Sequence, residues 1–272
     1  MVDAYTKVSC NESWLMKAVI LAGGLGTRIS EESHLRPKPM IEIGNFPIIW
    51  HIMKIYAHQG VNDFVICAGY KGYLIKEYFA NYVLHRSDVT IDMATHSIEY
   101  HRNAAEPWRV TIVDTGADTL TGGRLKRVGP LLTPGETFFL TYGDGVADIA
   151  LDKLLATHKA AGASATLTAV KPPGRYGATR IENGMVREFQ EKPSGDGGYI
   201  NGGFFALETS VLSEIEGDLV AWEAAPLQTL ASKMKLAAYQ HDGFWHAMDT
   251  LRDKNHLESL WQAGNAPWKI WN

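Results

Sequence analysis

Cysteine is scarce in this 272-residue chain, which contains only Cys10 and Cys67. Two cysteines cannot form a disulfide framework, so we expect a reducing, cytoplasmic location. Cys67 ends the apolar stretch 64–67 and is most simply a buried core thiol. Long apolar runs are also absent, since none approaches the roughly 18 residues of a membrane-spanning helix. The N-terminus lacks the layout of a signal peptide.

An excess of charge of either sign is missing as well. The chain has 26 lysines and arginines against 30 aspartates and glutamates, a formal net charge of −4. Without a basic stripe, nucleic-acid binding is not expected. The ten histidines include no His-x-His or His-Glu-x-x-His motif, and no Gly-x-Ser-x-Gly segment occurs. These absences argue against a zinc site and against a serine-hydrolase site.

Alternating strand-like and helix-like segments predict a parallel, doubly wound α/β sheet. Strands are predicted at 18–21, 64–67, 89–93, 109–113, 138–141, 164–170 and 236–239. Helices are predicted at 48–59, 73–84, 148–161, 209–216, 225–234 and 252–262. Asp148 is expected to cap the third of these helices, and Asn183-Gly184 predicts a hairpin. We expect residues 16–272 to form a single domain and residues 1–15 to be an N-terminal extension, either native or an artificial remnant.

The segment after the first predicted strand carries the clearest functional signal. Gly23-Gly24-Leu25-Gly26 places three glycines at a strand's carboxyl end, where open α/β sheets bind ligands. Glycines let the backbone approach a ligand and turn N–H groups toward an anion. Arg28 and Lys38 add positive charge, and the flanking prolines are expected to hold Lys38 in an extended segment. The pattern favours a polyphosphate site, although it matches neither the dinucleotide fingerprint nor the Walker loop, and a turn without a ligand stays open.

Two aspartates are candidate metal ligands. Asp144 follows an apolar strand and lies between Gly143 and Gly145, so its carboxylate is expected at the carboxyl edge of the sheet. Asp249 lies just before the last predicted helix. Mg²⁺ usually takes one or two carboxylates together with substrate phosphates. A type I′ turn at Asp144 and a helix N-cap at Asp249 explain the same pattern equally well, with Thr250 as the other possible cap.

Two later segments could hold a phosphorylated sugar. Glu191-Lys192-Pro193 ends a predicted strand, although an exposed lysine at a turn explains such a segment more often. Asn201-Gly202-Gly203 joins an amide side chain to a close backbone approach, and Asn and Glu side chains suit sugar hydroxyls. Trp245 lies near Asp249 in the sequence and could line a pocket.

Taken together, these motifs resemble the sugar-1-phosphate nucleotidyltransferases. The segments that carry the likeness, in that family's order and spacing, are Leu21–Arg28, Pro37–Pro39, Tyr142–Gly145, Glu191–Pro193 and Asn201–Gly203. Further segments resemble the cytidylyl-transferring branch, namely 39–43, 50–54, 115–116, 121–124 and 245–250. The resemblance implies a Rossmann-like, doubly wound mixed and mainly parallel α/β sheet of the nucleotide-diphospho-sugar transferase type, with small β-rich insertions.

The resemblance also implies roles for individual residues, with Arg28 and Lys38 catalytic. Nucleotide binding would fall to Leu21, Ala22, Gly23, Gly24, Leu25, Gly26, Thr27, Arg28, Lys38, Thr119, Arg124 and Gly143. The sugar phosphate would be held by Tyr142, Glu191, Lys192, Asn201 and Gly202. Asp144 and Asp249 would carry Mg²⁺.

The implied reaction transfers CMP from CTP to α-D-glucose 1-phosphate, giving CDP-glucose and pyrophosphate by in-line attack on the α-phosphorus. Its product would feed deoxysugar, O-antigen and lipopolysaccharide biosynthesis. A homo-oligomer such as a hexamer is implied, with neither nucleic acid nor membrane as a partner. Use of UTP or dTTP and a non-catalytic regulatory homologue stay open. One departure is Asn45-Phe46, where relatives often have Gly-Lys.

Overall fold

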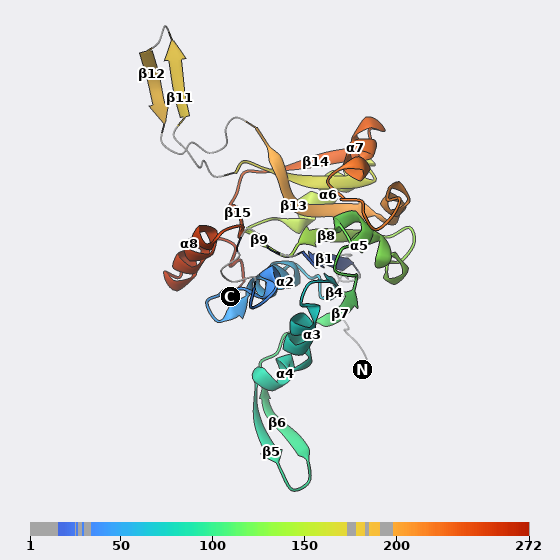
Figure 1. Cartoon of the computed structure of the whole chain (residues 1–272), viewed down its shortest axis with the longest axis vertical. Helices are drawn as coiled ribbons and strands as arrows, with labels where there is room; N and C mark the ends of the chain where they lie inside the picture. The colour runs from blue at the N-terminus through green and yellow to red at the C-terminus, as the bar shows by residue number, and fades with distance from the viewer. Residues whose placement is uncertain are drawn as a thin grey trace, which may run out of the picture.

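A seven-stranded sheet runs through the part of the chain that the computed structural model describes, residues 16–24, 26, 29, 34–172, 178–182, 185–190 and 198–271 (Figure 1). Its strand order is β14-β10-β13-β8-β1-β4-β7. The strands are β1 (Lys17–Ala22), β4 (Asp63–Ala68), β7 (Arg109–Asp114), β8 (Thr137–Tyr142), β10 (Ala165–Val170), β13 (Ile200–Glu208) and β14 (Leu236–His241). β13 runs antiparallel to β8 and β10, whereas the other neighbours are parallel. The mixed, mainly parallel sheet confirms the predicted fold class.

Helices cover both faces of this sheet, because its central strands are apolar on both sides. The helices are α2 (Ile48–His58), α3 (Gly72–Ala80), α4 (Tyr82–His85), α5 (Thr121–Arg127), α6 (Leu151–Ala161), α7 (Ala225–Ser232) and α8 (Leu251–Gln262). Ala18 and Ile20 of β1 belong to a core with α2 and α6, whereas Val19 and Leu21 belong to a second core with α5 and α7. No helix in the described ranges is long and apolar enough to cross a bilayer.

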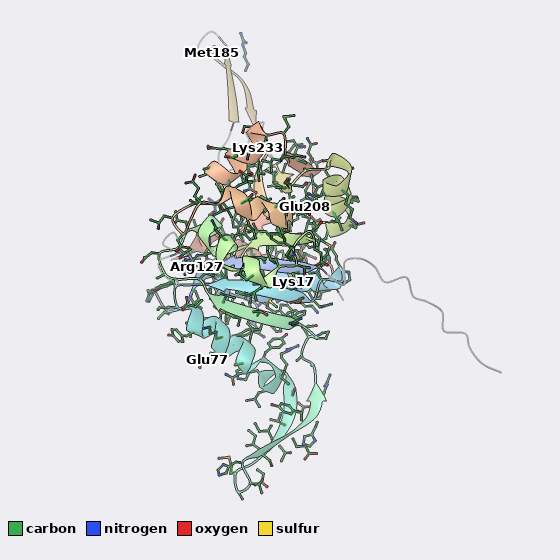
Figure 2. The ribbon with its side chains drawn as sticks, turned by 90° about the vertical axis from the view of Figure 1, so that its right-hand side faces the viewer. Lys17, Glu77, Arg127, Met185, Glu208 and Lys233 are labelled. Carbon is green, nitrogen blue, oxygen red and sulfur yellow. The ribbon has the colours of Figure 1, made fainter. Side chains whose placement is uncertain are left out.

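Four small two-stranded sheets accompany the central sheet and its helices, and they confirm the predicted β-rich insertions. They pair β2 (Glu42–Ile43) with β3 (Phe46–Pro47), β5 (Ser87–Asp92) with β6 (Ser97–Asn103), β9 (Gly145–Ala147) with β15 (Trp245–Ala247), and β11 (Ala178–Glu182) with β12 (Met185–Gln190). The β5–β6 and β11–β12 ribbons project from opposite ends of the molecule (Figures 1 and 2). The predicted hairpin is therefore present as β11–β12, although its turn residues Asn183 and Gly184 lie outside the described residues.

Two predicted helices differ in detail from the structure, and one predicted helix cap was wrong. The helix predicted over 73–84 is two helices, α3 and α4, which meet at Asn81. The predicted helix at 209–216 is a 3₁₀ helix, η5 (Thr209–Glu214). Asp148 does not cap α6, which begins at Leu151 and whose first N–H donates to Gln59 Oε1 at 2.8 Å. The cap comes from the end of α2, a tertiary contact that periodicity does not reveal.

An aromatic cluster fastens the C-terminal segment to α2. His51 is fully buried, donates from Nε2 to the Ile43 carbonyl at 2.9 Å, and accepts at Nδ1 from Trp268 Nε1 at 3.4 Å. The Phe46 ring stacks on Trp50 with centroids 4.0 Å apart. Phe46, noted above as a departure from the expected pattern, therefore packs in this cluster.

The two cysteine predictions have different outcomes. Cys67 is fully buried in the core below α5, as predicted, and burial raises the pKa of its thiol to about 12. Cys10 lies outside the described residues.

Candidate functional site

A cleft of about 340 Å³ opens where β1 and β8 end. Its lining residues are Leu21, Ala22, Gly23, Gly24, Gly26, Lys38, Pro39, Thr119, Leu120, Thr121, Arg124, Tyr142, Gly143, Asp144 and Asp249. The structure therefore brings together all the predicted nucleotide-binding residues that it describes. Leu25, Thr27 and Arg28 lie outside the described residues.

The glycine segment after β1 is held in place by a buried cation, the guanidinium of Arg124. Arg124 is 4 % exposed and donates from Nη2 to the Gly23 carbonyl at 2.9 Å. Its Nη1 donates to Thr115 Oγ1 at 2.8 Å and to the Gly116 carbonyl at 2.7 Å. A Cβ atom on Gly23 would lie 2.2 Å from the guanidinium, whereas one on Gly24 would meet nothing within 4 Å. Gly23 is thus required for packing on Arg124, and Gly24 leaves space in the cleft.

Lys38 does not lie in an extended segment, so that prediction was wrong. It begins a single 3₁₀ turn, η3 (Lys38–Met40), in which the Met40 N–H donates to the Pro37 carbonyl at 2.8 Å. Pro39 is tolerated because a residue in the first turn of a helix has no N–H partner to lose. The turn still fixes the backbone from which the lysine side chain starts.

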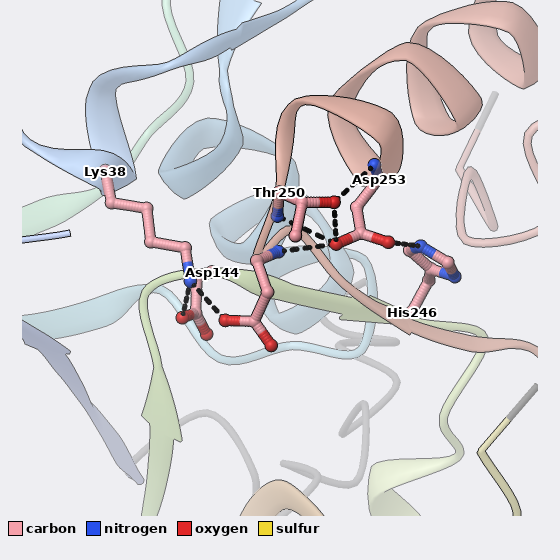
Figure 3. Close-up of polar contacts among 6 residues, drawn as sticks. Lys38, Asp144, His246, Thr250 and Asp253 are labelled. Atoms are coloured by element: carbon pink, nitrogen blue, oxygen red, sulfur yellow. Dashed lines mark hydrogen bonds and ion pairs between the residues drawn. The ribbon is translucent and has the colours of Figure 1, made fainter. Parts of the chain in front are cut away.

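The Lys38 ammonium bridges the two candidate metal ligands (Figure 3). Its Nζ lies 2.6 Å from Asp144 Oδ2 and 2.8 Å from Asp249 Oδ1. Burial acts to lower the pKa of Lys38, but the two carboxylates outweigh it and hold the pKa above its ordinary value. The structure therefore joins three predicted residues from distant parts of the sequence.

Neither alternative explanation of the aspartates holds. Asp144 follows β8, which pairs with β1 and β13, whereas β9 after it pairs with β15, so the segment is not a hairpin. Asp144 also lacks the positive φ of a type I′ turn. Helix α8 is capped by Thr250, whose Oγ1 accepts from the Asp253 N–H at 3.2 Å. Asp249 is therefore not the N-cap.

The pair of carboxylates suits a divalent cation that also binds phosphate. Both already converge on one positive charge, and hard oxygen ligands are those that Mg²⁺ prefers. No group of three or more His, Cys, Asp or Glu residues that could hold a metal occurs among the described residues. A cation held by Asp144 and Asp249 would thus keep coordination positions for substrate oxygens.

A second cleft of about 230 Å³ adjoins the first. Its lining residues are Thr141, Tyr142, Asp144, Gly145, Asn201, Gly202, Gly203, Phe204, Trp245, Ala247 and Asp249. Tyr142, Asp144 and Asp249 line both clefts, so the carboxylates stand at their junction. Of the predicted sugar-phosphate residues, Tyr142, Asn201 and Gly202 meet here, whereas Glu191 and Lys192 lie outside the described residues. Trp245 lines the cleft as expected and donates from Nε1 to the Gly202 carbonyl at 2.7 Å.

Glu223 accepts hydrogen bonds from two residues of the first cleft and was missed from the sequence. Tyr142 donates its hydroxyl to Glu223 Oε1 at 2.5 Å, and Thr121 donates to Oε2 at 2.6 Å. Asn201 Nδ2 donates to the Tyr142 oxygen at 3.3 Å. Burial and the neighbouring carboxylate raise the pKa of Tyr142, so its hydroxyl stays protonated. Glu223 carries no motif of its own, and only its partners identify it.

Comparison with known proteins defines the class. The family model described as nucleotidyl transferase matches residues 17–266. The chain belongs to this family.

Two relatives match this chain over nearly its whole length. It is 60 % identical over 256 residues to a glucose-1-phosphate cytidylyltransferase from Salmonella typhi, covering 94 % of this chain and all of the relative. It is 44 % identical to a probable glucose-1-phosphate cytidylyltransferase from Bacillus subtilis, again over 94 % of this chain and all of the relative. The crystal structure of HddC from Yersinia pseudotuberculosis shares the fold, with a TM-score of 0.66 at 21 % identity over 91 % of this chain and all of that one.

Proposed function

We propose that the chain transfers CMP from CTP to α-D-glucose 1-phosphate, forming CDP-glucose and releasing pyrophosphate. The observation that carries this proposal is the Lys38 bridge between Asp144 and Asp249 at the junction of two clefts. The 60 % identity to the Salmonella typhi protein, over its whole length, supports the choice of CTP and glucose 1-phosphate.

The two clefts divide the substrates between them. The glycine-lined cleft takes the nucleotide, because backbone N–H groups at strand ends favour phosphate. The second cleft takes the sugar phosphate, since its amide and phenol groups from Asn201 and Tyr142 suit hydroxyls. The sugar phosphate oxygen then faces the α-phosphorus across the junction where both carboxylates lie.

The chemistry requires positioning and charge neutralisation rather than a strong base. The sugar phosphate oxygen is anionic near neutral pH, forms the new bond to the α-phosphorus, and displaces pyrophosphate. Asp144 and Asp249 would hold Mg²⁺, which supplies Lewis-acid charge and a template for both phosphates. Lys38, freed from the carboxylates, brings an ammonium to the charge that grows in the transition state. We assign Arg28 the same task.

The direct test incubates the protein with glucose 1-phosphate, Mg²⁺ and either CTP, UTP or dTTP. The release of pyrophosphate is measured for each triphosphate. CTP should be used with a kcat/KM at least about 10²-fold above the others, because each base edge pairs differently with a fixed set of donors and acceptors. Preference for UTP or dTTP would contradict the base assignment. No pyrophosphate with any triphosphate would favour a non-catalytic homologue.

Residues 16–272 act as one nucleotidyltransferase domain, which the family match over 17–266 supports. The chain forms a homo-oligomer, which the apolar side chains exposed on the β5–β6 ribbon support. Its nucleotide sugar is consumed by enzymes that modify or transfer the activated glucose, as in deoxysugar and lipopolysaccharide synthesis.

A further inference from the structure

Asp253 gathers donors from the segment that carries Asp249 (Figure 3). Its Oδ2 accepts from the backbone N–H of Asp249 at 3.1 Å, and from the N–H and hydroxyl of Thr250 at 2.8 Å each. Its own N–H donates back to Thr250 Oγ1 at 3.2 Å, which completes a capping box on α8. One carboxylate oxygen thus fixes two successive peptides.

The backbone of Asp249 is held on both sides, by the pairing of β15 with β9 before it and by hydrogen bonds to Asp253 after it. On the first side, β15 pairs with β9, and the Met248 N–H donates to the Asp144 carbonyl at 2.8 Å. This ladder keeps the backbones of the two candidate metal ligands adjacent. β15 ends at Ala247, so the Asp249 and Thr250 peptides have left the ladder and donate to Asp253 instead.

His246 contacts the other carboxylate oxygen of Asp253. Its Nε2 lies 3.2 Å from Asp253 Oδ1, and the two side chains are only 14 % and 16 % exposed. His246 is itself a residue of β15, where it pairs with Val146 of β9. The histidine therefore ties the capping carboxylate to the strand that precedes Asp249.

We propose that Asp253 is a positioning residue for the metal site, acting through the Asp249 backbone to aim that carboxylate at Asp144, and that His246 orients Asp253. This inference rests on the proposed function, because it takes Asp144 and Asp249 as the metal ligands. Residues that orient metal ligands commonly change metal affinity or activity by about 10–100-fold when removed.

The test measures Mn²⁺ binding to the full-length chain by electron paramagnetic resonance, with no nucleotide present. Asp253→Ala should weaken Mn²⁺ binding by about 10–100-fold. Asp253→Asn keeps a carbonyl oxygen for the Asp249 and Thr250 donors and should bind Mn²⁺ within a few-fold of wild type. Urea unfolding of each variant checks that the fold is retained.

Glu258→Ala is the matched control, because Glu258 also lies on α8 and accepts from the Gly44 N–H at 2.7 Å. It removes a comparable helix contact on the side of β2 and β3, and should leave Mn²⁺ affinity within about twofold. If Asp253→Ala binds Mn²⁺ as Glu258→Ala does, the positioning role is wrong and the proposed function stands. If wild type binds no Mn²⁺, or Asp249→Asn binds it as wild type does, the metal site itself is wrong.

Kinetics supply a readout that general destabilisation would not give. In Asp253→Ala, kcat at low Mg²⁺ should fall about 10–100-fold and recover as Mg²⁺ is raised, with the KM for CTP unchanged. The recovery of kcat is expected because the Asp249 carboxylate is still present in this variant and only its orientation has changed. A loss of kcat that excess Mg²⁺ does not restore would contradict the positioning role.

Discussion

At the scale of single residues, the Lys38 ammonium lies between the two proposed metal ligands. The ammonium lies within 2.8 Å of both carboxylates, so it and a divalent cation compete for the same oxygens. Removing the ammonium takes away a positive charge that both carboxylates share. If Asp144 and Asp249 hold a metal as proposed, Lys38 would give up its contacts with them and become available to the substrate phosphates.

Lys38→Met should consequently bind Mn²⁺ about tenfold more tightly than wild type, while CMP transfer falls by about 10²–10³ in kcat, as when an oxyanion donor is lost. Titration of Mn²⁺ and single-turnover assays measure the two effects. Lys54→Met is the control, because Lys54 is a partly buried lysine that pairs with Glu106 at 2.9 Å in another part of the molecule. Equal or weaker Mn²⁺ binding by Lys38→Met would contradict the competition.

Which residues of the site could be predicted from the sequence follows from their local setting. Asp144 follows a predicted strand between two glycines, so its place at a strand end could be inferred. Lys38 could be singled out by its flanking prolines and its closeness to the glycine segment. The bridge between Lys38 and Asp144 depends on side chains 106 positions apart and is not encoded locally. Glu223 stands in no motif and gains its meaning only from Tyr142 and Thr121.

At the scale of elements, the joint between α2 and the C-terminal segment should respond to pH. His51 donates to Ile43 and accepts from Trp268, which requires a neutral ring. Burial lowers the pKa of His51 from 6.5 to about 4. Because the unfolded chain binds a proton below pH 6.5 and the folded chain does not, stability falls as pH drops from about 6.5 to about 4.

The contribution of His51 to the free energy of unfolding should shrink by about 3 kcal/mol between pH 7 and pH 4. Urea unfolding of wild type and His51→Gln at both pH values isolates the contribution of His51, since the two proteins share all other titrating groups. The difference in stability between the two proteins should narrow or reverse toward pH 4. A difference that is independent of pH would show that folding does not change the pKa of His51.

Strands and helices could be predicted where the pattern of apolar residues within the element is enough to define it. The runs in β1, β4 and α2 are locally complete, and each was found within two residues of its bounds. Ends were less predictable, since Gln59 caps α6 from a different helix. The 3₁₀ turn at Lys38 was missed because proline excludes the interior of a helix but not its first turn.

At the scale of the whole molecule, the β5–β6 ribbon stands away from the body (Figures 1 and 2). Ile91 and Ile98 face each other across it and are 51 % and 46 % exposed, and Met93 at its tip is 77 % exposed. An isolated two-stranded ribbon is at best marginally stable in water. Burial of its apolar side chains against another copy of the chain would stabilise it.

Replacing Ile91 and Ile98 together by threonine should therefore lower the mass measured by light scattering after size exclusion, with the far-ultraviolet circular dichroism of the fold retained. Glu99→Gln is the control, because Glu99 follows Ile98 on β6 and pairs with Thr90. Its mass should equal that of wild type. A monomeric wild type, or an unchanged mass in the double variant, would contradict assembly through this ribbon.

The alternation of strands and helices allowed the general architecture to be predicted, and the resemblance gave its mixed sheet. The ribbons could not be placed, because two short strands of alternating polarity do not specify where they project. The pairing of β9 with β15 was also unforeseen, although it sets Asp144 beside Asp249. Such contacts arise from the topology of the whole chain rather than from any one segment.

The central claim is that Lys38, Asp144 and Asp249 form the centre at which CMP is transferred. The most direct measurement is single-turnover formation of CDP-glucose from CTP and glucose 1-phosphate, with Mg²⁺, by wild type, Asp144→Asn and Asp249→Asn. Both variants should retain the fold and react about 10²–10³-fold more slowly, because the charge on the phosphates is no longer neutralised. A rate close to that of wild type in either variant would contradict the account.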